Sequence, residues 1–408
     1  MTMNTKSSVL APGWPIFLFL LFATVPNTFT TTLLSPGLPL LAAELGNGPR
    51  GIAYAQMLMT VPGIAMIASP LLGWLADRWG KRPILLAALF TDTAAGLGCM
   101  MTTDFTVLII LRFILGLGVG ALMTVSLSMI GDYYGGEART KMLGYRWCAM
   151  TFFSLLAVQA GGFLANSHGW AAPMWLYLVG VPLFIFALLR VKPGSHNVKV
   201  AVETQAIEQQ PLRETINAIF VFAMLGNVFL ALAQYNLYTQ LPFLLREKGF
   251  LDPRTFAAIM LPAPLASIGI TLCFARLRRW MHPLAIIATC LAFFSLGTLL
   301  FVHADDVAGL LIASAVTGSA SVLFEPALSS FLLDRIHASR RAFAMGAIFS
   351  TFHVGPFLIP IVFGPVNRMY GFSTSFMLLA GAALFGAVLL IIGLRGRIRP
   401  DPVLAAPA

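Results

Sequence analysis

Charged residues gather between two long apolar runs, in the stretch Gly73-Trp-Leu-Ala-Asp77-Arg78-Trp-Gly80-Lys81-Arg82-Pro83. Its glycines permit a tight turn and close approach of another chain segment. Asp77 offers a carboxylate, and the three basic side chains can pair with acids. A carboxylate that pairs with an arginine in one conformation and releases it in another would act as a latch. The alternative is a loop that only anchors the topology of the chain.

Four further ionisable residues fall inside apolar runs: Asp92, Arg112, Glu325 and His353. A guanidinium in an apolar layer needs a partner, and Asp92 is within reach of Arg112 if their helices are neighbours. The two then form either a coupling pair or a static ion pair. Glu325 suits the binding and release of a proton, unless it pairs with a basic loop residue. His353 is either a proton relay or a packing residue.

The elements that carry these residues are membrane helices, because 58% of the 408 residues are hydrophobic and only 10% are charged. Mean hydropathy is +0.84, and a span needs about 20 apolar residues. The predicted fold is an all-α polytopic membrane protein with twelve transmembrane helices, at 14–40, 51–74, 83–102, 105–131, 142–165, 172–191, 213–244, 254–275, 283–302, 307–331, 343–366 and 371–394.

The basic residues are distributed unevenly between the two sides of this topology. Of 26 Lys and Arg, we assign 20 to the termini and the loops on one side, Arg146 among them. Five lie on the other side, and Arg112 lies inside a helix; the five are Arg50, Arg246, Lys248, Arg254 and Arg368. Positive residues mark the cytoplasmic side, so both termini are predicted to be cytoplasmic. The net charge of +10 then reflects topology and not nucleic-acid binding.

The two halves of the sequence repeat each other. Pro39 matches Pro242 and Glu44 matches Glu247 at an offset of 203 positions. Five matches fall at 202: Gly116 with Gly318, Asp132 with Asp334, Arg139 with Arg341, Gly144 with Gly346, and Gly169-Trp170 with Gly371-Phe372. We predict a six-helix bundle at 1–191, a cytoplasmic linker at 192–212, a second bundle at 213–394 and a cytoplasmic tail at 395–408. A parallel repeat of this kind is typical of transporters with a midplane site.

The loop at 73–83 resembles the motif between helices 2 and 3 of the major facilitator superfamily, where it is thought to hold the cytoplasmic gate shut. Arg112, Gly116 and Gly120 resemble the helix 4 motif of its proton-coupled members. The chain is most similar to the twelve-helix drug:proton antiporters. It departs from them in helix 5, whose motif survives only as Gly161-Gly162, and in helix 1, which lacks the acid of some drug exporters.

This resemblance implies that helices 1, 4, 7 and 10 line the substrate cavity. The cavity candidates on them are Asn27, Thr31, Met123, Ser126, Asn227, Gln234, Tyr235, Tyr238 and Phe324. Aromatic and methionine side chains with few charges suit a lipophilic or weakly cationic solute. The same residue types are also the ordinary filling of membrane helices.

We therefore expect a monomeric, proton-coupled exporter of small organic or drug-like molecules in a bacterial inner membrane. The alternatives are an importer or a sugar or metabolite permease of the same fold. A membrane enzyme would need a cluster of His, Asp, Ser or Cys in an interfacial loop, and none is evident. We expect no cofactor and no metal site, because the four cysteines lack ligand spacing and no phosphate-binding loop is present. The lipid bilayer, protons and a small-molecule substrate are the expected partners.

Overall fold

The structure is a computed structural model of the chain. It describes residues 13–46, 48–134, 136–191, 218–333, 335–336, 347–348 and 350–395. The predicted linker at 192–212 and nearly all of the predicted tail at 395–408 lie outside these residues. So do Asp334, Arg341 and Gly346, which belong to the repeat.

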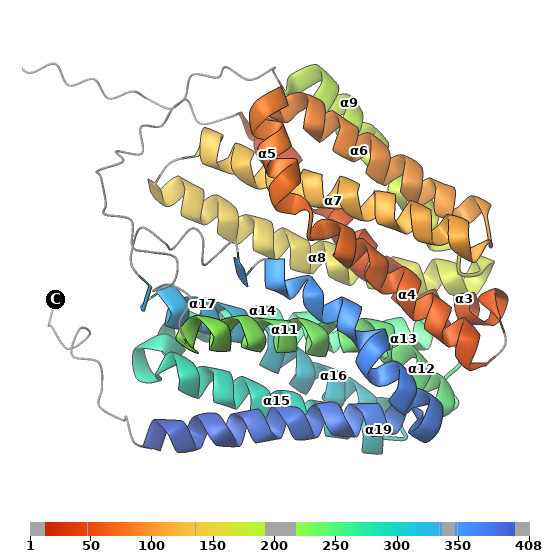
Figure 1. Cartoon of the computed structure of the whole chain (residues 1–408), viewed down its shortest axis with the longest axis vertical. Helices are drawn as coiled ribbons and strands as arrows, with labels where there is room; N and C mark the ends of the chain where they lie inside the picture. Colours follow the sequence, from red (N-terminus) through yellow and green to blue (C-terminus); the bar gives the residue numbers. More distant parts are fainter. Residues whose placement is uncertain are drawn as a thin grey trace, which may run out of the picture. The chain divides into compact units, whose positions relative to one another are not determined.

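Within these ranges every regular element is a helix. In the first half of the chain (Figure 1, red to yellow-green) the elements are α1 (Trp14–Phe22), α2 (Val25–Thr28), η1 (Phe29–Leu33), η2 (Ser35–Gly37), α3 (Leu38–Leu45), α4 (Pro49–Met66), α5 (Ser69–Trp79), α6 (Lys81–Gly98), η3 (Cys99–Met101), α7 (Phe105–Tyr133), α8 (Gly136–His168), η4 (Ala172–Val179) and α9 (Gly180–Arg190).

In the second half (Figure 1, green to blue) they are α11 (Ala218–Thr239), α12 (Leu241–Glu247), α13 (Pro253–Met260), α14 (Pro262–Trp280), α15 (Pro283–His303), α16 (Val307–Ser321), α17 (Phe324–Leu333) and α19 (Val354–Arg395). Proline stands in the first turn of α12, α13, α14 and α15, where its missing N–H costs nothing.

The described residues confirm the twelve-helix prediction. Ten helices are long and apolar enough to cross a membrane, and α4 and α5, bent by 45° at their break, make an eleventh. One of the ten, Ser350–Leu394, has 45 residues, about twice what a hydrocarbon layer of ~30 Å needs. Gly371, at φ 80° and ψ 169°, interrupts it. Two spans therefore lie on either side of Gly371, and the total is twelve.

The chain forms two compact units. Unit 1 comprises the described parts of Met1–Leu34, Val61–Ala160 and Trp170–Thr204. Unit 2 comprises those of Ser35–Thr60, Gly161–Gly169 and Gln205–Ala408. Unit 2 thus contains short stretches from the first half of the sequence as well as the second half. The predicted division into two six-helix bundles around a linker stays a prediction.

The repeat found in the sequence reappears in how glycines pack. In unit 1, a Cβ on Gly116 of α7 would lie 2.5 Å from the carbonyl oxygen of Pro62 in α4. In unit 2, a Cβ on Gly318 of α16 would come closer still to the carbonyl oxygen of Ala263 in α14. Both approaches are far shorter than van der Waals contact. Only glycine lets each pair of backbones approach so closely.

Two other repeat pairs also have matching local structure. Gly169 and Gly371 have φ of +85° and +80°, a left-handed conformation that glycine adopts without strain. Pro39 and Pro242 each stand in the first turn of a short helix, α3 and α12 respectively. The matched positions therefore mark equivalent turns and helix starts.

Candidate functional site

The predicted loop at 73–83 is mostly helical, because residues 73–79 end α5 and residues 81–83 begin α6. The chain reverses in a sharp turn at Gly80 alone. Gly80 has φ +97° and ψ 147°, which a residue with a Cβ adopts only with strain. A Cβ on Gly73 would lie 2.9 Å from the Cγ2 of Thr124 in α7. One glycine thus permits the turn and the other permits the close packing of α5 on α7, as their residue type predicts.

The basic residues of this loop fasten it to unit 1. The Nζ of Lys81 lies 2.6 Å from Oδ2 of Asp132 at the end of α7. The Nη2 of Arg82 donates a hydrogen bond of 2.7 Å to the carbonyl of Leu188 in α9. Arg78 lies over the ring of Trp74, with its Cζ 5.5 Å from the centroid.

Asp77 is different, because it is exposed and has no ion pair with any described residue. Its carboxylate is available for a partner in another conformation. The latch role of the motif remains a prediction. In the described part of the chain its three basic residues have partners, and its acid has no ion pair.

Asp92 of α6 and Arg112 of α7 are both buried, with 1% and 2% exposure, on helices that pack together. They interact electrostatically, but no nitrogen of Arg112 lies within 4 Å of an oxygen of Asp92. One oxygen of Asp92 and Nη1 of Arg112 lack hydrogen-bond partners. Arg112 also interacts electrostatically with Tyr177. The hydroxyl of Tyr177 lies 3.5 Å from the hydroxyl of Thr30. The pair is thus part of a buried polar cluster and is not a closed salt bridge.

Arg146 is the residue that the sequence reasoning misplaced. We assigned it to the basic loops, but it lies in α8 and is only 3% exposed. Its Nη1 donates to the hydroxyl of Ser126 at 2.9 Å, and its Nη2 donates to the sulfur of Met123 at 3.1 Å. The signal was available, because Arg146 lies within the predicted span 142–165. An arginine inside a span needs a polar partner, as Arg112 does.

Met123 and Ser126 were predicted to line the substrate cavity. Both are buried against Arg146 in unit 1. A substrate that contacts Met123 or Ser126 would therefore lie close to this guanidinium.

Glu325 lies where the tenth span is broken. Helix α16 ends at Ser321 and α17 begins at Phe324, so Glu325 stands in the first turn of α17, followed by Pro326. Free N–H groups at a helix N-terminus stabilise a negative charge. Glu325 is half-buried and has no ion pair with any described residue. No cation in the described part of the chain therefore fixes its charge.

Asn227 and His353 are both buried and belong to unit 2. The side-chain amide of Asn227 in α11 donates to the carbonyl of Ile348 at 2.5 Å and to the hydroxyl of Thr351 at 3.1 Å. It joins α11 to the eleventh span, while its own oxygen has no partner. His353 is buried at a break in that span, next to Val354, where α19 begins.

The remaining cavity candidates fall into two groups. In unit 1, Asn27 is buried and its carbonyl accepts a 2.9 Å hydrogen bond from the half-buried Thr31. In unit 2, Gln234, Tyr235 and Tyr238 on α11 are half-buried, and the ring of Tyr235 lies 6.0 Å from that of Phe352.

Phe324 is buried, with its ring 3.9 Å from a Cβ placed on Gly226 of α11. It therefore packs in the contact between α11 and α17. Whether these residues touch a substrate stays a prediction.

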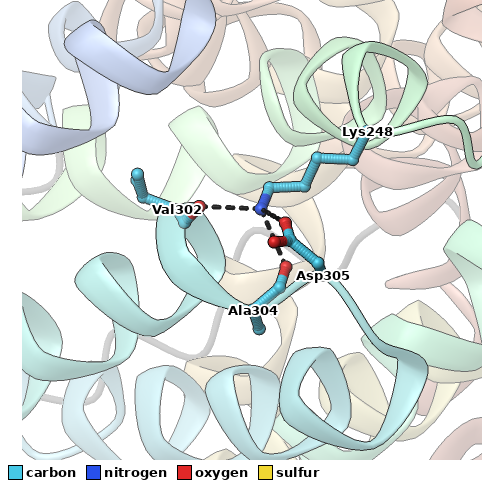
Figure 2. Close-up of polar contacts among 4 residues, drawn as sticks. All are labelled: Lys248, Val302, Ala304 and Asp305. Atoms are coloured by element: carbon cyan, nitrogen blue, oxygen red, sulfur yellow. Dashed lines mark hydrogen bonds and ion pairs between the residues drawn. The ribbon is translucent and has the colours of Figure 1, made fainter.

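Three consecutive residues at the end of α12 hold segments of unit 2 together. Figure 2 shows Lys248, whose Nζ donates to the carbonyls of Val302 and Ala304 at 2.7 and 2.8 Å and pairs with Asp305 at 2.8 Å. Its three N–H groups are all used, and it closes the end of α15.

The two preceding residues bind other segments of unit 2. The backbone N–H of Phe372 lies 3.5 Å from a carboxylate oxygen of Glu247. Arg246 donates to the carbonyl of Pro39 in α3 at 3.1 Å. The end of α12 is thereby joined to α3, to α15 and to the Gly371 turn.

Comparison with known proteins gives these features a context. Among relatives, the 3-(3-hydroxy-phenyl)propionate transporter of Escherichia coli is 28% identical over 406 residues, covering 93% of this chain and 96% of that protein. The quinolone resistance protein NorA of Staphylococcus aureus is 24% identical over 372 residues, covering 88% and 92%. The multidrug transporter protein MdtP of Bacillus subtilis is 27% identical over 192 residues, 47% of this chain and about a third (33%) of that protein.

Solved structures show the same fold. A D-xylose-proton symporter superposes with a TM-score of 0.75 at 15% identity, covering 97% of this chain and 99% of its own. A point mutant of the nucleoside transporter NupG superposes with a TM-score of 0.72 at 17% identity, covering 92% and 99%. Residues 20–307 match the family model of the Major Facilitator Superfamily. This chain is therefore an integral membrane protein that belongs to the Major Facilitator Superfamily of transporters.

Proposed function

We propose that this protein is a proton-coupled secondary transporter that exports small organic molecules by alternating access. The observation that carries the coupling is Glu325, a half-buried carboxylate at a break in the tenth span with no cation among the described residues to fix its charge. Ionisable side chains inside a membrane span face the interior of the bundle or a cavity. A carboxylate at such a break can take up a proton on one side and release it on the other.

Export is supported by the names of two relatives, a multidrug transporter and a quinolone resistance protein. We place the 73–83 loop and both termini in the cytoplasm of a bacterial cell, because basic residues mark that side. The protein then works in the inner membrane without a cofactor, driven by the proton gradient. We take the working unit to be a monomer, because each chain carries both halves of the repeat.

The alternative is a transporter of a small metabolite, favoured by the match to the 3-(3-hydroxy-phenyl)propionate transporter over 93% of this chain. The two proposals share the proton-carrying Glu325 and differ in direction and substrate.

The test is transport by purified protein in liposomes under an imposed pH gradient. Labelled lipophilic cations, quinolones, sugars and aromatic acids are offered in turn. We expect wild-type protein to move a substrate against the substrate's own concentration gradient only when a pH gradient is present. The orientation of the pH gradient that drives this movement shows whether the protein exports or imports the substrate.

Glu325→Gln is expected to abolish this uphill transport while substrate exchange across the membrane continues. The exposed Glu44→Gln is the matched control and should behave like wild type. Uphill transport by Glu325→Gln would remove Glu325 from the coupling role. Downhill movement alone in wild type would replace the proposal with a facilitator.

A further inference from the structure

Arg146 is a buried basic residue of unit 1, and the proposed coupling through Glu325 gives it no role. Its neighbours Tyr145 and Trp147 are each 54% exposed, whereas Arg146 itself is 3% exposed. Successive residues of a helix point about 100° apart. The two aromatic rings therefore occupy the outer surface of α8, and the guanidinium points inward to α7.

No acid in the described part of the chain pairs with Arg146. A guanidinium has five N–H donors, and Arg146 uses two of them, for the Ser126 hydroxyl and the Met123 thioether. Thioether sulfur is a weak acceptor. An uncompensated charge buried in this way costs several kcal/mol in a membrane protein.

The buried charges of unit 1 do not balance. Among the described residues of this unit, the buried acidic and basic side chains are Asp92, Arg112 and Arg146. Asp92 and Arg112 interact with each other, which leaves Arg146 as one excess positive charge. An anionic group would balance this charge.

We propose that Arg146 binds the anionic group of the transported molecule, and that the substrates are small organic carboxylates. A planar guanidinium matches a carboxylate through two parallel hydrogen bonds. A carboxylate oxygen is a far better acceptor than the sulfur of Met123, so it would take the place of that sulfur. The Ser126 hydroxyl would keep the guanidinium oriented. This proposal rests on the transporter role and names its substrate class.

A phospholipid headgroup has related chemistry, but the exposed face of α8 carries Tyr145 and Trp147, and Arg146 faces away from it. We therefore assign the site to a solute and not to a lipid.

The test is equilibrium binding, which needs no proton gradient. Wild-type protein is placed in nanodiscs of zwitterionic lipid, and binding of benzoate is measured by calorimetry and by the rise in melting temperature. Aliphatic and larger aromatic carboxylates extend the series, and inorganic phosphate and tetraphenylphosphonium complete the panel. We expect carboxylates to bind, and Arg146→Gln to weaken benzoate binding at least tenfold.

Arg146→Lys keeps the charge but loses the paired donors, so it should give an intermediate affinity. It also serves if Arg146→Gln does not fold. Arg190→Gln, which removes an exposed arginine at the end of α9, is the matched control and should bind benzoate as wild type does. Tetraphenylphosphonium binding should not respond to Arg146.

Three results would overturn the proposal: no binding of any carboxylate to wild type, equal benzoate affinity in wild type and Arg146→Gln, or stabilisation through Arg146 by anionic phosphatidylglycerol nanodiscs but not by benzoate. Any of them leaves proton coupling through Glu325 untouched, because coupling is measured separately. Conversely, carboxylate binding through Arg146 without uphill transport would keep this site and reject the coupling.

Discussion

The ammonium group of Lys248 caps α15: its three hydrogen bonds go to the carbonyls of Val302 and Ala304 and to the carboxylate of Asp305. The last carbonyls of a helix lack partners inside it, and a cation there also opposes the helix dipole. The side chain of Lys248 is 10% exposed, so its charge is largely withdrawn from water. Lys248→Met should destabilise the protein by about 1–3 kcal/mol, the cost of leaving buried polar groups without partners. Thermal unfolding in detergent measures it.

The matched control is Asp305→Asn, which leaves the two carbonyl bonds in place. Because Asp305 is largely exposed (87%), its loss should lower the melting temperature much less. An equal loss in the two variants would show that the carbonyl contacts contribute nothing.

Asp305 also predicts a pH dependence. The hydrogen bond and charge of Lys248 lower the pKa of this loop carboxyl. A depressed pKa stabilises the folded state above the ordinary aspartate pKa of about 3.9. That contribution disappears as the pH falls through the lowered folded value. The difference in melting temperature between wild type and Asp305→Asn should therefore be constant near neutral pH and shrink below about pH 4. A difference that grows on acidification would contradict the assignment.

Variants of Asp77 and Asp132 should distinguish an effect on gating from an effect on stability. Asp132 holds Lys81 in this structure, whereas Asp77 has no ion pair among the described residues. Asp132→Asn should thus lower stability by about 0.2–1 kcal/mol, the range for exposed ion pairs. Asp77→Asn should leave the melting temperature unchanged and slow transport. Unaltered transport rates in Asp77→Asn would reduce the loop to an anchor of topology.

Gly116 and Gly318 should be equally intolerant of a side chain, because each touches the backbone two membrane spans earlier in its half. Gly116→Ala and Gly318→Ala should each destabilise by about 1–3 kcal/mol or more, as overpacked sites do. Gly144 and Gly269 have nothing within 4 Å of a built Cβ. Their alanine variants are the controls and should keep or slightly raise stability. If all four variants melt alike, the close contacts do not limit packing.

The same glycines show what could be predicted from the sequence. The 202-residue offset predicted that Gly116 and Gly318 are equivalent, and hydropathy predicted the twelve spans, because both depend on local residue types. That Arg146 contacts Ser126 and Met123 and no described acid could not be read in this way. It depends on which residues of α7 face α8, and that is decided by packing between helices.

Helix breaks were only partly predictable. Pro326 follows Glu325 in the sequence, but proline is also tolerated inside α19 at Pro360 and Pro365. Proline alone therefore does not tell a broken span from an unbroken one. The contact of Asn227 with the eleventh span was likewise invisible, because its partners lie 121 and 124 residues away.

Variants of Asp92 and Arg112 test whether the polar cluster of unit 1 is static or takes part in transport. Reversing either charge alone leaves two like charges buried together and should reduce folded protein severely. The double exchange, Asp92→Arg with Arg112→Asp, should recover part of the yield if the two interact directly. The neutral pair Asp92→Leu with Arg112→Met removes both buried charges and should fold well, since apolar replacement of a buried pair is often neutral or stabilising.

Transport by this neutral pair then distinguishes the two roles. If it retains proton-driven transport at the wild-type rate, the pair serves the fold alone. Because the two side chains interact without closing a salt bridge, and each has an unsatisfied polar atom, we expect the neutral pair to fold but to lose coupling. Failure of the double exchange to recover any folded protein would show that their surroundings, and not their mutual attraction, fix each charge in place.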